Sequence, residues 1–170
     1  FIRTFDVSLA QKFDMKRINH LKEVIVEPKL DGIRCFSIVE NGEVKMYARS
    51  GKLITNFERT IAPELLKMGD GCYDGELMGQ DFISLMRQAY RKDDVDTSGT
   101  FLSLFDYVPL KEWQSRNATM TCTDRFERLL DLIDENNINL NIVTPIDREI
   151  VDTDYTEIKR LHDFYVQSGY

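Results

Sequence analysis

Hydrophobic and polar residues follow two patterns along the chain, one typical of strands and one typical of helices. β-Branched residues at 24–26 and an apolar run at 35–39 indicate strands. Asn41-Gly42 separates that run from another apolar stretch, and Asn-Gly between strand-like segments is a strong hairpin signal. We therefore predict antiparallel strands over 34–40 and 43–49. Further apolar runs predict strands over 101–108, 142–145 and 149–151.

Apolar residues three and four positions apart predict helices elsewhere. Residues 82–90 follow this spacing closely, which predicts a helix whose apolar stripe faces the core. Similar stripes predict three more helices, over 61–66, 126–133 and 155–165. Thr123 and Asp124 supply a cap for the second of these, and Ser8 with Gln11 predicts a short helix near the amino terminus. Without a regular βαβ alternation, the pattern favours an α+β fold of mainly antiparallel sheets flanked by helices.

Length, composition and charge narrow the class of protein. The 170 residues suit a single domain, and 42% hydrophobic with 30% charged residues is typical of neither disordered nor membrane proteins. The net charge of −7 argues against a surface that binds nucleic acid all over, although it permits a local basic groove. The cysteines Cys35, Cys72 and Cys122 are an odd number at spacings that suit neither disulfides nor zinc. We expect free thiols in a reducing cytoplasm.

The sharpest chemical feature is the segment 27–34, which reads Glu-Pro-Lys-Leu-Asp-Gly-Ile-Arg. It offers an amine on Lys29, a carboxylate on Asp31 and a guanidinium on Arg34 around a flexible glycine. A lysine amine becomes a nucleophile when its surroundings favour the neutral form, and an arginine can hold a phosphate with two hydrogen bonds. A solvated surface turn is the competing interpretation, and the segment alone does not decide between the two.

Three further segments follow in order: Ala48-Arg49-Ser50-Gly51, Tyr73-Asp74-Gly75-Glu76-Leu77 and Leu104-Phe105-Asp106-Tyr107-Val108. Together with Lys-x-Asp-Gly-x-Arg at 29–34, they resemble the motifs of the covalent nucleotidyltransferases. The order and spacing are similar to those of ATP-dependent DNA ligases of the bacteriophage and viral type. The resemblance covers residues 27–110 and implies a ligase adenylation domain with an ATP-grasp-like fold.

The resemblance implies a three-step reaction that begins on Lys29. The lysine would attack the α-phosphorus of ATP, with magnesium neutralising phosphate charge. The resulting adenylate would pass to the 5′-phosphate of a nick in double-stranded DNA, where the 3′-hydroxyl displaces AMP. Asp31 would orient or charge-balance the lysine, and Asp74 would support the site. The sequence assigns no metal ligand.

The resemblance also implies which residues hold the nucleotide. Arg34 and Arg49 would bind phosphate or sugar oxygens, Glu76 would accept a hydrogen bond from a ribose hydroxyl, and Phe105 would stack on the adenine. Glu27 would lie near the exocyclic amine of the base.

Several of these residues also have ordinary structural interpretations. Phe105, in an apolar strand, would by itself be assigned to the core. Arg49 and the dipeptide Asp74-Gly75 could each mark a turn. Asp81, with Asp93, Asp94 and Asp96, is interpreted as part of a solvated loop rather than a metal site.

We further expect residues 1–170 to be an incomplete adenylation domain. The family's later Glu-Gly and Lys-x-Lys motifs and its oligonucleotide-binding-fold domain do not occur in this sequence, so the fragment alone is expected to be weak or inactive. The family implies a monomer without membrane association. It also implies an intracellular location, the host cytoplasm for a viral protein, and roles in DNA repair, replication and recombination.

Other functions use the same lysine motif. An mRNA capping guanylyltransferase would take GTP, an RNA ligase would form the same adenylate, and an NAD-dependent ligase would carry an extra amino-terminal module. A non-catalytic nucleotide-binding module is the alternative from another class. Preference for ATP, GTP or NAD distinguishes the ATP-dependent ligases from the capping enzyme and from the NAD-dependent ligase.

Overall fold

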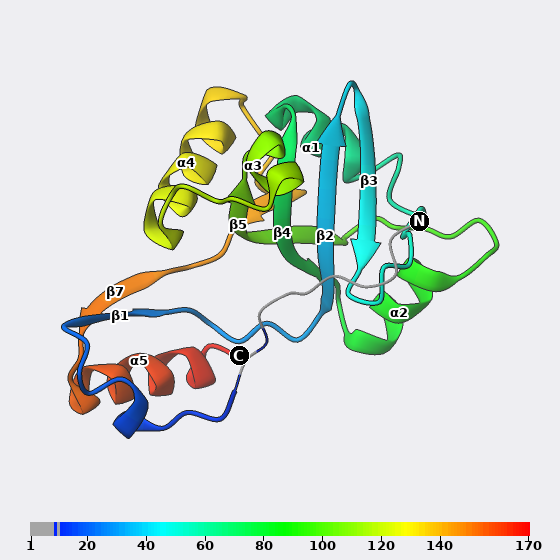
Figure 1. Cartoon of the computed structure of the whole chain (residues 1–170). Coiled ribbons are helices and arrows are strands. Elements are labelled where there is room, and N and C mark those ends of the chain that lie inside the picture. Colours follow the sequence, from blue (N-terminus) through cyan, green and yellow to red (C-terminus); the bar gives the residue numbers. More distant parts are fainter. Residues whose placement is uncertain (1–8, 10) are drawn as a thin grey trace. The chain divides into compact units, whose positions relative to one another are not determined.

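The computed structural model describes residue 9 and residues 11–170, which form two compact units. Of the described residues, the larger unit comprises Gly32–Pro145, and the smaller one comprises residue 9 and residues 11–31 together with Ile146–Tyr170. Figure 1 shows the helices and strands of both units.

A five-stranded sheet in the order β3-β2-β4-β5-β6 forms the centre of the larger unit. Its strands are β2 (Ile33–Glu40), β3 (Glu43–Ala48), β4 (Gly71–Met78), β5 (Phe101–Val108) and β6 (Val143–Pro145). All neighbours are antiparallel except β5 and β6. Asn41 and Gly42 have φ values of 51° and 78°, the left-handed conformations that a tight hairpin turn requires. The predicted hairpin and the antiparallel α+β class are confirmed.

Four helices of the larger unit are α1 (Ala62–Met68), α2 (Phe82–Tyr90), α3 (Leu110–Ser115) and α4 (Cys122–Glu135). Helix α1 packs on β3, and α4 packs on β5 and β6. Leu65, Leu85, Leu104 and Leu129 are fully buried in the resulting core. Helix α3 was not predicted, because six residues after Pro109 are too few to display a periodic stripe.

The structure refines three details of the predicted helices. Leu85 and Ala89 are buried, but Phe82 and Met86 are 46% and 38% exposed, so only part of the α2 stripe faces the core. Asp81 is exposed, as expected, and its carboxylate also caps α2 by accepting a hydrogen bond from the Ser84 N–H. Helix α4 begins earlier than expected, because the hydroxyl of Thr121 supplies its cap.

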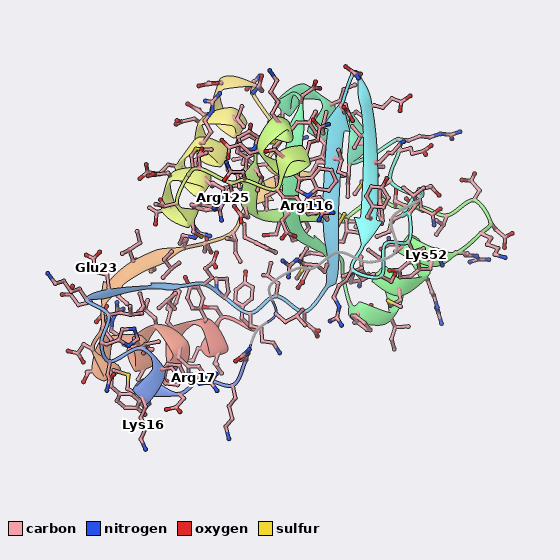
Figure 2. All side chains as sticks on the ribbon, in the orientation of Figure 1. Lys16, Arg17, Glu23, Lys52, Arg116 and Arg125 are labelled. Carbon is pink, nitrogen blue, oxygen red and sulfur yellow. The ribbon has the colours of Figure 1, made fainter. Side chains whose placement is uncertain are left out.

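In the smaller unit, β1 (Glu23–Val26) pairs antiparallel with β7 (Glu149–Asp152). Helix α5 (Tyr155–Gln167) buries Leu161 and Tyr165, and the short 3₁₀ turn η1 (Met15–Arg17) precedes β1. Figure 2 labels Arg17 on this turn. The helix predicted to start at Ser8 begins outside the described residues, and 11–14 are not helical.

The cysteines are free, as the sequence predicts. Cys35 and Cys72 are buried, and burial raises the pKa of each thiol to about 12, whereas Cys122 is exposed. Among the helices of residues 11–170, none is both long and apolar enough to cross a membrane.

Candidate functional site

The register of β2 and β4 gathers three of the predicted residues on one face of the sheet. Arg34 lies opposite Glu76, and Asp74 lies on the same face two residues earlier in β4. The Arg34 guanidinium donates two hydrogen bonds to the Asp74 carboxylate, from Nε to Oδ1 at 2.8 Å and from Nη2 to Oδ2 at 2.7 Å. Glu76 Oε2 accepts from the Gly32 N–H at 3.1 Å. The structure therefore brings residues of the Lys-x-Asp-Gly-x-Arg motif into contact with residues of the later Asp-Gly-Glu motif.

Phe105 joins this group through a β-bulge. Asp74 pairs with Asp106 and Gly75 pairs with Leu104, so Phe105 is the extra residue of β5. A bulge disrupts the strict alternation of side chains and can aim one of them to the other face. Phe105 is half-buried rather than part of the core, and the Arg34 Cζ atom lies 4.7 Å from its ring centroid. The core interpretation of Phe105 is thus wrong.

The turn interpretation of Asp74-Gly75 is also wrong, because both residues lie inside β4. The strand needs glycine at this position for a steric reason. A Cβ on Gly75 would lie 2.4 Å from the carbonyl oxygen of Ser103 and 2.9 Å from the Leu104 side chain. Gly75 therefore permits the close approach of β5 at the bulge that positions Phe105.

We expect Gly75→Ala to destabilise the protein by about 1–3 kcal/mol, because the added methyl group meets backbone atoms. Gly79→Ala is the matched control: its Cβ would make ordinary contacts at 3.4 Å or more. We expect its free energy of unfolding to stay within about 0.5 kcal/mol of wild type. Urea denaturation of both variants measures the difference. Equal stability of the two would contradict this account of the bulge.

Burial and the contact with Arg34 shift the pKa of Asp74 in opposite directions. Burial raises the pKa of Asp74, and the nearby Asp106 charge raises it further, whereas the Arg34 hydrogen bonds lower it; the net direction is upward. The hydrogen bond to Asp74 raises the pKa of Arg34, which stays charged. A half-buried carboxylate and a fixed guanidinium form an electrostatic environment suited to binding polar oxygens of a ligand.

A second ion pair adjoins the first and was not found by sequence reasoning. Arg125 of α4 binds Asp106 with Nε to Oδ1 at 2.8 Å and Nη2 to Oδ2 at 3.0 Å. Figure 2 labels Arg125 on the helix beside the sheet. Asp106 lies in the segment Leu104-Phe105-Asp106-Tyr107-Val108, but no local pattern links it to a residue of α4.

Arg49 directly follows β3 and is exposed. The register pairs Cys35 with Ala48, so Arg49 lies at the same end of the sheet as Arg34. Its neighbours Ser50 and Gly51 form a turn closed by the Gly51 N–H to the Ala48 carbonyl oxygen. The turn interpretation and a binding role for Arg49 are therefore compatible.

Three predicted residues belong to the smaller unit. Lys29 and Asp31 are exposed in the connection that follows β1. The carboxylate of Glu27 accepts hydrogen bonds from Arg148 at 3.0 and 3.2 Å. This ion pair was also not predicted, because Arg148 precedes β7 at the far end of the chain.

Within residues 11–170, no group of three or more His, Cys, Asp or Glu side chains is arranged to hold a metal ion. Asp93, Asp94 and Asp96 are exposed. Magnesium therefore remains a prediction for the bound nucleotide.

Solved structures share this fold. The structure named Pmar-Lig_Pre. is 29% identical and covers 99% of this chain and 41% of its own, with a TM-score of 0.85. Chlorella virus DNA ligase-adenylate is 18% identical and covers 94% of this chain and 54% of its own, with a TM-score of 0.68. The ligase from bacteriophage T7, in complex with ATP, is 18% identical and covers 86% of this chain and 55% of its own, with a TM-score of 0.59.

These likenesses and the gathered residues define the nucleotidyltransferase fold of DNA ligases. The family model of the ATP-dependent DNA ligase domain matches residues 8–170, and the chain belongs to this family. It spans about two fifths of the Pmar-Lig structure and about half of the viral ligases. No curated protein matches the chain.

Proposed function

We propose that this chain forms the adenylation part of an ATP-dependent DNA ligase that carries AMP covalently on Lys29. The observation that supports it most strongly is the convergence of Arg34, Glu76 and Phe105 on one face of the sheet in a chain of this family. Gly32, whose N–H binds Glu76, follows Lys29 by three residues. Three residues span at most about 11 Å, so the chain itself keeps Lys29 near this group.

In the first step, the neutral amine of Lys29 attacks the α-phosphorus of ATP. A nitrogen–phosphorus bond forms, the bond to the bridging oxygen breaks, pyrophosphate leaves, and the amine releases a proton. Asp31 orients or charge-balances the amine. An in-line arrangement of attacking and leaving groups is the general requirement for phosphoryl chemistry of this kind.

The remaining residues hold the nucleotide in place. Phe105 presents its ring to the adenine, Glu76 accepts from a ribose hydroxyl, and Arg34 and Arg49 bind phosphate or sugar oxygens. Asp74 supports Arg34 through the observed ion pair. Glu27 would approach the exocyclic amine of the base by exchanging its contact with Arg148.

In the next two steps, the 5′-phosphate at a nick in double-stranded DNA attacks the lysine-bound AMP and releases the lysine. The adjacent 3′-hydroxyl then attacks the activated phosphate, a phosphodiester bond forms, and AMP leaves. We assign these steps to the whole protein, including an oligonucleotide-binding-fold domain. From its membership of the ligase family, we propose that the whole protein acts on DNA inside the cell, in repair, replication and recombination.

The intact mass of the protein after separate incubation with magnesium and ATP, GTP or NAD tests the proposal. We expect an increase by one adenylate with ATP alone, from this chain or from a version extended past Tyr170. A guanylate would indicate a capping enzyme instead, and an adenylate from NAD would indicate the other class of ligase. No adduct from either version would contradict the proposal and favour a nucleotide-binding module. Sealing of nicked DNA against nicked RNA separates a DNA ligase from an RNA ligase.

A further inference from the structure

Two carboxylates face each other across neighbouring strands beside the proposed nucleotide site. Asp74 of β4 and Asp106 of β5 are direct partners in the antiparallel ladder. Like charges directly opposite each other destabilise a sheet. Such a pair persists when each carboxylate is neutralised by a separate cation.

Each carboxylate is held by an arginine from a different side. Arg34 of β2 binds Asp74, and Arg125 of α4 binds Asp106, each through two nitrogen–oxygen contacts of 2.7–3.0 Å. The remaining terminal nitrogen of Arg125 donates to the Met120 carbonyl oxygen at 2.9 Å. Arg125 is thereby fixed at both ends of its guanidinium. We call these four side chains the four-charge network.

We infer that Arg125 is a positioning residue: by holding Asp106, it reserves the Asp74 carboxylate for Arg34 and keeps the Arg34 guanidinium over Phe105. The negative charge of Asp106 acts on both Asp74 and Arg34. Without Arg125, that charge repels Asp74 and offers Arg34 a competing partner. The consequence for nucleotide affinity rests on the proposed function, whereas the coupling within the network does not.

A double-mutant cycle tests the inference, with Arg125→Gln, Asp106→Asn and the double variant compared with wild type. Arg128→Gln is the matched control, because Arg128 lies on the same helix but pairs with Glu135. Carbon-13 NMR titration gives the pKa of Asp74, and calorimetry gives the affinity for ATP without magnesium. Thermal unfolding shows whether each variant is folded.

We expect Arg125→Gln to raise the pKa of Asp74 by about one unit, because the Asp106 charge is no longer neutralised. ATP affinity should fall about tenfold as Arg34 loses its fixed position. Asp106→Asn in the same chain should reverse both changes, since it removes the uncompensated charge. Arg128→Gln should change neither. Arg125→Lys, which keeps the charge without the planar fork, should lie between wild type and Arg125→Gln.

An unchanged Asp74 pKa in Arg125→Gln, or no recovery in the double variant, would overturn the inference. A shifted pKa with unaltered ATP affinity would overturn the positioning role. If Arg125→Gln does not fold, Arg125→Lys and the single Asp106→Asn variant test the inference in its place. Arg125→Lys must raise the pKa of Asp74, and Asp106→Asn must lower it. Absence of ATP binding by the wild-type protein would instead contradict the proposed function, and the Asp74 titration would still test the network.

Discussion

Lys29→Ala is expected to abolish formation of the covalent adenylate. Alanine has no nucleophilic nitrogen, so the first step has no acceptor for AMP, and we expect a loss of at least about 10³-fold. Lys29→Arg should fail as well, because a guanidinium stays protonated at neutral pH. The measurement is intact mass after incubation with magnesium and ATP, for a version of the protein in which the wild type forms the adduct.

Lys22→Ala is the matched control for this variant. Lys22 is exposed in the same unit, immediately before β1, and we assign it no role in the reaction. Its adenylate yield should equal that of wild type. Normal labelling of Lys29→Ala would show that another residue is the nucleophile. Equal loss in both lysine variants would instead indicate a general effect of removing positive charge from this unit.

Local patterns were enough to predict most of the strands and helices. Asn41-Gly42 identified the hairpin because a two-residue turn with positive φ values is encoded at the turn itself. The pairing of β1 with β7 was not predicted, because its partners are far apart in the sequence and no local signal links them. The exposure of part of the α2 stripe was not predicted for a similar reason. Periodicity gives the width of an apolar helix face but not how much of that face packs against other elements.

The candidate site shows the same division between local and long-range information. Motif resemblance identified Arg34, Glu76 and Phe105, which the sheet then brings together. It did not predict how Phe105 leaves the core, because a bulge depends on the register of two strands. Arg125 was invisible to sequence reasoning, since only the packing of α4 on β5 brings it to Asp106.

Phe105→Ala is expected to weaken ATP binding by about 1–3 kcal/mol, the usual contribution of one base stacked on an aromatic ring. This corresponds to a Kd about 5- to 150-fold higher. The structure makes the result interpretable, because Phe105 is half-buried at a bulge rather than enclosed in the core. Its removal should therefore affect folding less than the loss of a fully buried phenylalanine. Calorimetric titration with ATP measures the change.

Phe105→Tyr and Phe82→Ala separate stacking from general effects on the fold. Tyrosine retains the aromatic ring and Phe105 is only half-buried, so Phe105→Tyr should bind ATP close to wild type. Phe82 is an exposed aromatic residue of the same unit on α2, and its removal should leave the Kd unchanged. If Phe105→Ala is folded and binds ATP normally, the ring does not stack on the base, and its contact with Arg34 is structural. If only Phe105→Ala loses affinity while its thermal stability is retained, the aromatic face itself is the binding element.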